Sequence, residues 1–253
     1  MPAIPHTAMI FAAGYGTRMR PLTDALPKPL VPVLGKPLID YRLDKLAEIG
    51  VKRVVVNTHY KAEMLEAHLA RRKDMEIIIS REETLLETGG GLVKALPWLG
   101  DRPIYLLNAD MIWMDNETPA LIRLAEQWDD STMDELLLLQ PRERALGYHG
   151  TGDFGLDAAS HLQRKDTPPY PFVFTGIQIF HPKRLAAFSV EPFSRNILWK
   201  NAWREENGTF ERLYGLPHIG EWLHIDSVEN LKDAEAYLTA QTSRDSCLST
   251  RLK

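Results

Sequence analysis

Five short apolar runs, separated by stretches with helical patterns, constrain the fold of this chain more than any other feature. The runs span Met9–Ala13, Arg53–Asn57, Glu76–Ser80, Ile104–Asn108 and Glu135–Gln140. Apolar runs of about five residues are typical of strands that are buried on both faces. Helices between such strands cover a mostly parallel sheet on both sides. We therefore expect an α/β fold.

The helical patterns supply the elements that would cover this sheet. They span Pro37–Ile49, Glu63–Ala70, Gly91–Leu99, Pro119–Trp128 and Val228–Ala240. Residues 142–171 differ, because they are rich in Gly, Asp, His and Pro and read GYHGTGDFG and KDTPPYP. This composition predicts loops and short antiparallel strands in a small lid-like subregion. We expect one domain over residues 1–241, followed by a polar tail at 242–253 that frays.

Composition excludes several classes of protein. The 253 residues are 44% apolar and 25% charged, which is average for a globular protein, and the net charge of −4 gives no sign of a nucleic-acid or membrane partner. The single cysteine, Cys247, excludes a disulfide framework and a cysteine-based metal site. Neither a secretion signal nor a membrane-spanning run is visible. We expect a cytoplasmic protein, either a monomer or a small homo-oligomer.

A glycine turn follows the first apolar run directly, where a parallel sheet binds its ligands. Gly14 and Gly16 allow positive φ angles, so that backbone N–H groups can face an anion. Two common phosphate motifs do not fit. The dinucleotide fingerprint needs a third glycine at Met19, and the P-loop ends in Gly-Lys-Ser/Thr. The missing glycine argues against a dinucleotide-dependent oxidoreductase.

Four cations follow this turn in a proline-rich loop. They are Arg18, Arg20, Lys28 and Lys36. Arginine offers a planar fork to phosphate, and lysine acts as a mobile point charge. The prolines on both sides of Lys28 reduce the entropy that is lost when this side chain is fixed. The ordered spacing predicts a polyphosphate site.

The segment Gly14–Leu38, GYGTRMRPLTDALPKPLVPVLGKPL, resembles the signature of the sugar-1-phosphate nucleotidyltransferases at every fixed position. The runs ETGGG, NAD and FTGIQIF, which begin at Glu87, Asn108 and Phe174, continue the resemblance. LETGGG, KALPWLG and GTGDF are most similar to the N-acetylmuramate-1-phosphate uridylyltransferases of cell-wall recycling. The resemblance implies a Rossmann-like fold. It also implies transfer of a nucleotidyl group from UTP to N-acetylmuramic acid 1-phosphate, with release of pyrophosphate.

The resemblance also implies roles for individual residues. Arg18 and Lys28 would bridge the α-phosphate and the triphosphate, and Asp110, directly after an apolar strand, would hold Mg²⁺ or Mn²⁺. The nucleotide would contact Ala12, Ala13, Gly14, Gly16, Thr17, Glu87, Thr88, Gly89, Gly90 and Asn108. The sugar phosphate would contact Asp153, Lys165 and Gly176. We expect Glu87–Gly90 to form a loop, in which the glycines let the backbone pass close to the base.

One segment departs from the family pattern. Where the family has W-x-D-V-G-T, this chain reads Trp222 to Ser227, with His224 at the aspartate position and Asp226 at the glycine position. Imidazole suits Mn²⁺ better than Mg²⁺. His224 could contact phosphate or metal, Asp226 could replace the missing carboxylate, or Asp110 could act alone with the substrate phosphates. A structural histidine bonded to a nearby backbone group fits equally well.

Two alternatives to the uridylyltransferase stay open. A mannose-1-phosphate guanylyltransferase, or another hexose-1-phosphate enzyme, would share the same signature. A non-catalytic nucleotide-sugar sensor is compatible with His224 and with the Asn-Ala-Asp variant at Asn108. The presence of Arg18, Lys28 and Asp110 together favours catalysis over sensing. The absence of a hexapeptide repeat argues against the larger bifunctional uridylyltransferase–acetyltransferases.

Overall fold

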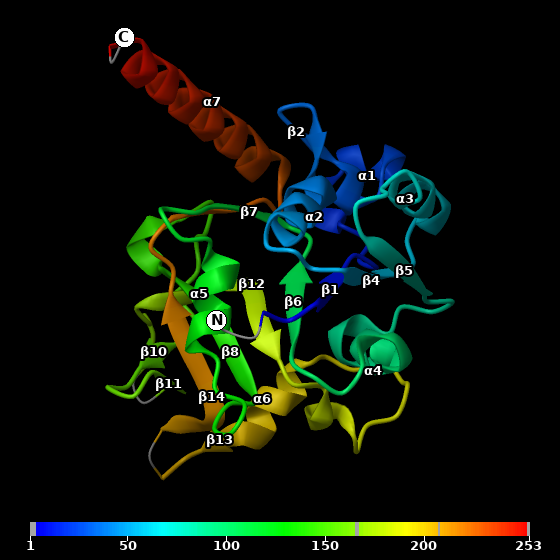
Figure 1. Ribbon diagram of the computed structural model, residues 1–253, viewed down its shortest axis with the longest axis vertical. Coiled ribbons are helices and arrows are strands. Elements are labelled where there is room, and N and C mark those ends of the chain that lie inside the picture. Colours follow the sequence, from blue (N-terminus) through cyan, green and yellow to red (C-terminus); the bar gives the residue numbers. More distant parts are fainter. Residues whose placement is uncertain (1–3, 165–166, 207, 252–253) are drawn as a thin grey trace.

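A ten-stranded mixed sheet forms the centre of the computed structural model, which describes residues 4–164, 167–206 and 208–251 (Figure 1). Its strand order is β10 (Gly155–Leu156), β11 (His161–Gln163), β14 (Thr209–Pro217), β8 (Glu135–Pro141), β12 (Phe172–Phe180), β6 (Ile104–Asn108), β1 (Thr7–Phe11), β4 (Arg53–Thr58) and β5 (Glu76–Arg81), with β13 (Trp203–Arg204) beside β14. The half from β6 to β5 is parallel throughout. The expected α/β, Rossmann-like sheet is confirmed.

Helices cover both faces of this sheet. The α-helices are α1 (Leu22–Ala25), α2 (Leu38–Glu48), α3 (Ala62–Leu69), α4 (Glu87–Leu99), α5 (Ala120–Gln127), α6 (Asn196–Ala202) and α7 (Val228–Arg251), and the 3-10 turns are η1 (Thr17–Met19), η2 (Lys28–Leu30), η3 (Arg142–Arg144) and η4 (Pro182–Leu185). α2, α3 and α5 pack with Ala8 and Ile10 of β1, whereas α4 and α6 pack with Met9. Alternate residues of one strand therefore enter two different hydrophobic cores.

Two structural differences from the expected elements bear on the site. β1 ends at Phe11 rather than at Ala13, because the N–H of Ala12 donates to the side chain of Asn57 at 2.7 Å instead of continuing a strand. The run FTGIQIF at Phe174 lies in β12, which begins at Phe172 and is antiparallel, rather than parallel, to both β6 and β8.

The register of the parallel strands decides where polar residues meet. Phe11, the last residue of β1, pairs with Asn57 of β4 on one side and with Asn108 of β6 on the other. The segments after these three strands therefore leave the sheet at the same carboxyl edge. This is the edge at which α/β sheets bind ligands.

Two small sheets and a long helix complete the fold. β15 (Glu221–His224) lies between β7 (Met111–Met114) and β9 (Ala145–Leu146), and β2 (Pro32–Val33) forms a hairpin with β3 (Lys36–Pro37). α7 packs through Leu231 and Ala234 and then extends away from the body (Figure 1). It continues to Arg251 as a helix, although the sequence predicts a frayed tail from residue 242. Among the described residues, no helix has the length and apolarity needed to cross a membrane.

Candidate active site

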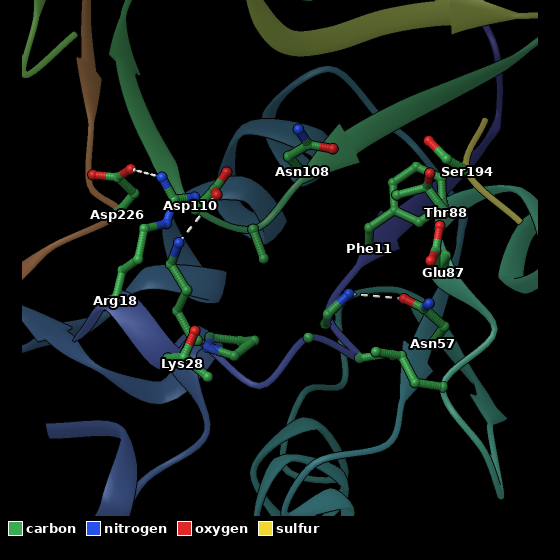
Figure 2. A pocket seen from close by; sticks show the side chains of 18 residues that line it. Phe11, Arg18, Lys28, Asn57, Glu87, Thr88, Asn108, Asp110, Ser194 and Asp226 are labelled. Carbon is green, nitrogen blue, oxygen red and sulfur yellow. Dashed lines mark hydrogen bonds and ion pairs between the residues drawn. The ribbon is translucent and has the colours of Figure 1, made fainter. Parts of the chain in front are cut away.

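A cleft of ≈ 490 Å³ lies at the carboxyl edge of β1 and β6 (Figure 2). Its lining residues are Phe11, Ala12, Ala13, Gly14, Gly16, Thr17, Arg18, Lys28, Pro29, Asn57, Leu85, Glu87, Thr88, Asn108, Ala109, Asp110, Ser194 and Asp226. We call the side with Arg18, Lys28, Asp110 and Asp226 the charged wall. The opposite side, with Glu87, Thr88 and Ser194, is the α4 wall. Twelve of the predicted site residues thus lie in one cleft: all three residues predicted to be catalytic, eight of the ten predicted nucleotide contacts, and Asp226.

The glycine turn places Lys28 against the charged wall. Gly16 has φ +62°, and a Cβ on it would come within 2.8 Å of the Lys28 Cβ. The Thr23 hydroxyl donates to the Gly16 carbonyl at 2.9 Å and holds the turn in place. A side chain at Gly16 would therefore strain the backbone and displace Lys28.

Two ion pairs cross the charged wall (Figure 2). Lys28 Nζ donates to Asp110 Oδ2 at 3.0 Å, and the Arg18 guanidinium donates to Asp226 Oδ2. The side chain of Lys28 is 13% exposed, whereas that of Arg18 is 68% exposed. Lys28 is therefore held in place by its surroundings, and Arg18 has room to move toward a ligand.

A short antiparallel strand pair brings Asp226 beside Asp110. In β7 and β15, Met111 pairs with His224, and the N–H of Ile225 donates to the Asp110 carbonyl at 2.9 Å. Asp226 Oδ1 also accepts from Asn230 Nδ2 at 2.7 Å. Of the two residues left open by the sequence, Asp226 lines the cleft. His224 does not line it; its ring stacks on Trp222 with centroids 5.5 Å apart.

Electrostatics set the charge states of these groups. Burial acts to raise the pKa of Asp110, but the charges of Lys28, His224 and Arg42 and the Lys28 hydrogen bond together hold that pKa below its ordinary value. Burial lowers the pKa of His224, although Asp110 and Asp226 act in the opposite direction. Asp110 is therefore ionised and His224 is neutral at pH 7.

The donor set fits a divalent cation that is held partly by substrate. Among the described residues, no three His, Cys, Asp or Glu side chains form a metal cluster. Asp110 and Asp226 supply two carboxylates at one wall, and carboxylates combined with phosphate oxygens are the usual ligands of Mg²⁺. Both carboxylates are paired with cations here. A metal would therefore bind together with a polyphosphate that takes over those cations.

A buried arginine behind Asp110 was not singled out from the sequence. Arg42 of α2 is fully buried; its Nε donates to the Asn108 carbonyl at 3.1 Å, and Nη1 donates to the Leu38 carbonyl. Burial lowers its pKa to about 9, against the opposing effect of Asp110, so that the guanidinium stays charged at pH 7. Its position within the apolar stripe of the helix was the signal that could have marked it.

The α4 wall differs from the expected loop, because Glu87–Gly90 form the first turn of α4. Glu87 and Thr88 line the cleft, and Gly89 and Gly90 do not. A Cβ on Gly89 would lie 2.2 Å from the Phe193 ring, and one on Gly90 would lie 2.0 Å from the Glu191 carbonyl oxygen. These two glycines therefore permit close packing of α4 on residues 191–193, rather than close approach of a base.

Ser194 reaches the cleft through the same packing. The N–H of Gly89 donates to the Phe193 carbonyl at 2.9 Å, and the N–H of Arg195 donates to the Thr88 hydroxyl at 3.0 Å. These bonds hold Ser194 next to Thr88. No local sequence pattern marks Ser194, because its position depends on contacts between distant segments.

A buried hydrogen-bonded chain links the segment before the glycine turn to the start of α4. Asn57 accepts from the Ala12 N–H and donates to Glu82 Oε1 at 2.7 Å, and Glu82 Oε2 accepts from the Leu86 N–H at 2.9 Å. Asn57 and Glu82 are 3% and 2% exposed. The glycine turn and the start of α4 are thus held by one polar network, which the sequence reasoning missed.

Two of the residues predicted to contact the sugar phosphate, Asp153 and Gly176, do not line the cleft. Asp153 accepts from the Phe174 N–H at 2.9 Å, and burial raises its pKa. Gly176 has φ +80°, and a Cβ on it would come within 2.8 Å of Asn108 Nδ2, so this glycine accommodates Asn108. Lys165 lies outside the described residues. The sugar-contacting roles stay predictions.

The two remaining cations of the loop form ion pairs with nearby surface residues. Arg20 pairs with Asp24 at 3.3 Å, and Lys36 pairs with Asp44. Neither cation lines the cleft. The charged wall therefore uses two of the four cations that the sequence places in this loop.

Comparisons with known proteins agree with this arrangement. The nucleotidyl transferase family model matches residues 7–200. N-acetylmuramate alpha-1-phosphate uridylyltransferase of Caulobacter vibrioides is 40% identical over 94% of this chain and 99% of that relative. The protein of the same name from Neisseria meningitidis is 32% identical over 90% of this chain and 96% of that relative.

The fold also matches a solved structure. UDP-glucose pyrophosphorylase complexed with UDP-glucose superposes with a TM-score of 0.72 at 17% identity, covering 94% of this chain and 100% of that chain. The resemblance to the sugar-1-phosphate nucleotidyltransferases is confirmed by the family match and by the two relatives. The chain belongs to the nucleotidyl transferase family.

Proposed function

We propose that this chain transfers the uridylyl group of UTP to N-acetylmuramic acid 1-phosphate and releases pyrophosphate. The observation that carries the reaction is that Lys28, Arg18, Asp110 and Asp226 meet at one wall of a cleft beside a glycine turn. The names of the two uridylyltransferases that are 40% and 32% identical support the choice of substrates. The single cysteine of the sequence fits a reducing compartment, and we propose the cytoplasm.

The reaction needs positioning and charge stabilisation more than acid–base chemistry. A phosphate oxygen of the sugar phosphate attacks the α-phosphorus of UTP, and the bond from that phosphorus to the pyrophosphate oxygen breaks. The electron pair leaves with pyrophosphate. The nucleophile is already an anion, so no general base is required. Lys28 and Arg18 would bind the phosphates and stabilise the charge that develops on them.

Asp110 and Asp226 are the residues that would hold a divalent cation. When bound, Mg²⁺ would offset the charge of the triphosphate, which otherwise repels the second anionic substrate. Phosphate oxygens would take over Lys28 and Arg18, and this would free the two carboxylates. His224 stacks on Trp222, and its Nδ1 lies 3.9 Å from Asp226 Oδ2, so it would orient that carboxylate rather than bind Mg²⁺.

A pyrophosphate-release screen tests the proposal. Purified protein would be assayed with UTP, GTP, dTTP, CTP and ATP against a panel of sugar 1-phosphates, each with Mg²⁺ and with Mn²⁺. We expect the fastest release with UTP and N-acetylmuramic acid 1-phosphate. Preference for GTP and mannose 1-phosphate would change the substrates and keep the reaction. Nucleotide binding without any release would favour the sensor.

A further inference from the structure

Arg42 is buried next to this cleft, and the proposed chemistry does not use it. It lies on α2, fully buried, beneath the corner between β6 and β7 that carries Asp110. Its guanidinium donates to the carbonyls of Asn108 and Leu38, and Nη2 lies 3.3 Å from the Met111 sulfur. Two of these partners, Asn108 and Met111, flank the Ala109–Asp110 pair. All three partners are uncharged.

A second buried arginine shows what an ordinary structural role looks like. Arg195 lies 3.4 Å from Glu135, a carboxylate that is itself fully buried, and its guanidinium stands over the Trp199 ring at 5.0 Å. Among the residues that the structure describes, no carboxylate lies within ion-pair distance of Arg42. A buried charge without an oppositely charged partner destabilises the folded protein. Stability alone therefore gives no reason for a cation at this position.

The charges of the charged wall give a reason. Arg18 pairs with Asp226, and Lys28 pairs with Asp110, so these four groups cancel in charge. Of the charged groups near Arg42, Asp110 raises the pKa of Arg42 most. Among these five groups, Arg42 therefore leaves one positive charge in surplus, next to the two residues that flank the Ala109–Asp110 pair.

We propose that Arg42 supplies the surplus positive charge that attracts a nucleoside triphosphate, by offsetting Asp110 from behind so that Lys28 stays available to phosphate. Arg42 is a positioning residue, because it has no access to the cleft and acts through Asp110. The inference rests on the proposed function of the cleft. Its charge is shielded from solvent ions, so its effect resists added salt more than that of the exposed Arg18.

Three proteins test this role: the unmodified chain, Arg42→Met and Arg42→Lys. Methionine fills a similar volume without charge, and lysine keeps the charge without the fork. UTP binding is measured by calorimetry in EDTA, so that no metal takes part. We expect Arg42→Met to bind UTP at least about tenfold more weakly, as loss of a nearby charge requires. We expect Arg42→Lys to recover most of the affinity.

Thermal unfolding separates this role from a structural one. We expect the Tm of Arg42→Met to stay within about 5 °C of that of the unmodified protein. The variant loses the hydrogen bonds of Arg42, but it also loses the cost of burying its charge. Arg195→Met should lower the Tm further, since it leaves Glu135 buried without a cation. Unchanged UTP affinity in Arg42→Met, or equal weakening in Arg42→Lys, would overturn the inference alone. If the unmodified protein neither binds UTP nor turns it over, the proposed function is overturned as well.

Discussion

The two walls of the cleft are built by different means. The charged wall relies on side chains that bridge it, with Lys28 on Asp110 and Arg18 on Asp226. The α4 wall relies on backbone packing, because Gly89 and Gly90 let the helix lie directly against residues 191–193. Lys28 and Arg18 of the charged wall can exchange their carboxylate partners for a ligand when one binds. The α4 wall can hardly move without unpacking the helix, so it is suited to set the shape of the cleft.

Removal of Lys28 should have the largest effect. Lys28→Ala leaves Asp110 without its cation and removes the phosphate contact, and we expect kcat/KM to fall by about 10²–10³-fold. The measurement is steady-state pyrophosphate release with saturating Mg²⁺. Lys36→Ala is the matched control, since Lys36 pairs with Asp44 outside the cleft. A loss of less than about tenfold in Lys28→Ala would contradict the charged wall as described.

Replacement of Asp226 should have the next largest effect, and it tests which residue replaces the missing aspartate of the family pattern. We expect Asp226→Asn to lower kcat/KM by about 10–100-fold and to raise the Mg²⁺ concentration needed for half-maximal rate. His224→Ala should change the same quantities by less than about threefold, because His224 does not line the cleft. The reverse order of effects would assign the metal to His224.

A methyl group at Gly90 should break the α4 wall without changing any charge. Its Cβ would lie 2.0 Å from the Glu191 carbonyl oxygen, so we expect Gly90→Ala to lower the free energy of unfolding by about 1–3 kcal/mol. Denaturant unfolding measures this loss. Gly155→Ala is the control, because the nearest atom to its Cβ would be 3.9 Å away. Equal stability of the two variants would show that α4 is free to shift.

A change of pH should have the smallest effect on the charged wall. The lowered pKa of Asp110 keeps it ionised well below pH 6, so UTP binding should not change through this group between pH 8 and 6. Stability should change, however. Burial lowers the pKa values of His181, His218 and His224 below 6.5, so the unfolded chain binds more protons as the pH falls below about 6.5.

The free energy of unfolding should therefore decrease, so that the folded protein is less stable, as the pH is lowered from 7.5 to 5.5. Denaturant unfolding at these two pH values measures the change. His218→Gln should reduce the dependence on pH, because His218 is 2% exposed. An unchanged dependence in that variant would exclude His218 as a source.

Most of the charged wall could be predicted from the sequence, whereas the packing that forms the α4 wall could not. Gly16 and Lys28 belong to one local sequence pattern, and the turns between them bring the two residues into contact. Asp226 could be named only as one of several candidates, because the pairing of β7 with β15 decides which side chain faces the cleft. Ser194 and the packing role of Gly90 depend on contacts between distant segments, which leave no periodic signal in the sequence.

Asp226 is separated from Arg18, its ion-pair partner, by 208 positions along the chain. A growing chain on the ribosome therefore carries the glycine turn and Lys28 long before it carries the second carboxylate. Synthesis adds about 5–20 residues per second. The 208 positions therefore take about 10–40 s to make, and Arg18 lacks its ion-pair partner for that time. The carboxylate that pairs with Arg18 in the finished protein is thus supplied last, after every other residue of the charged wall.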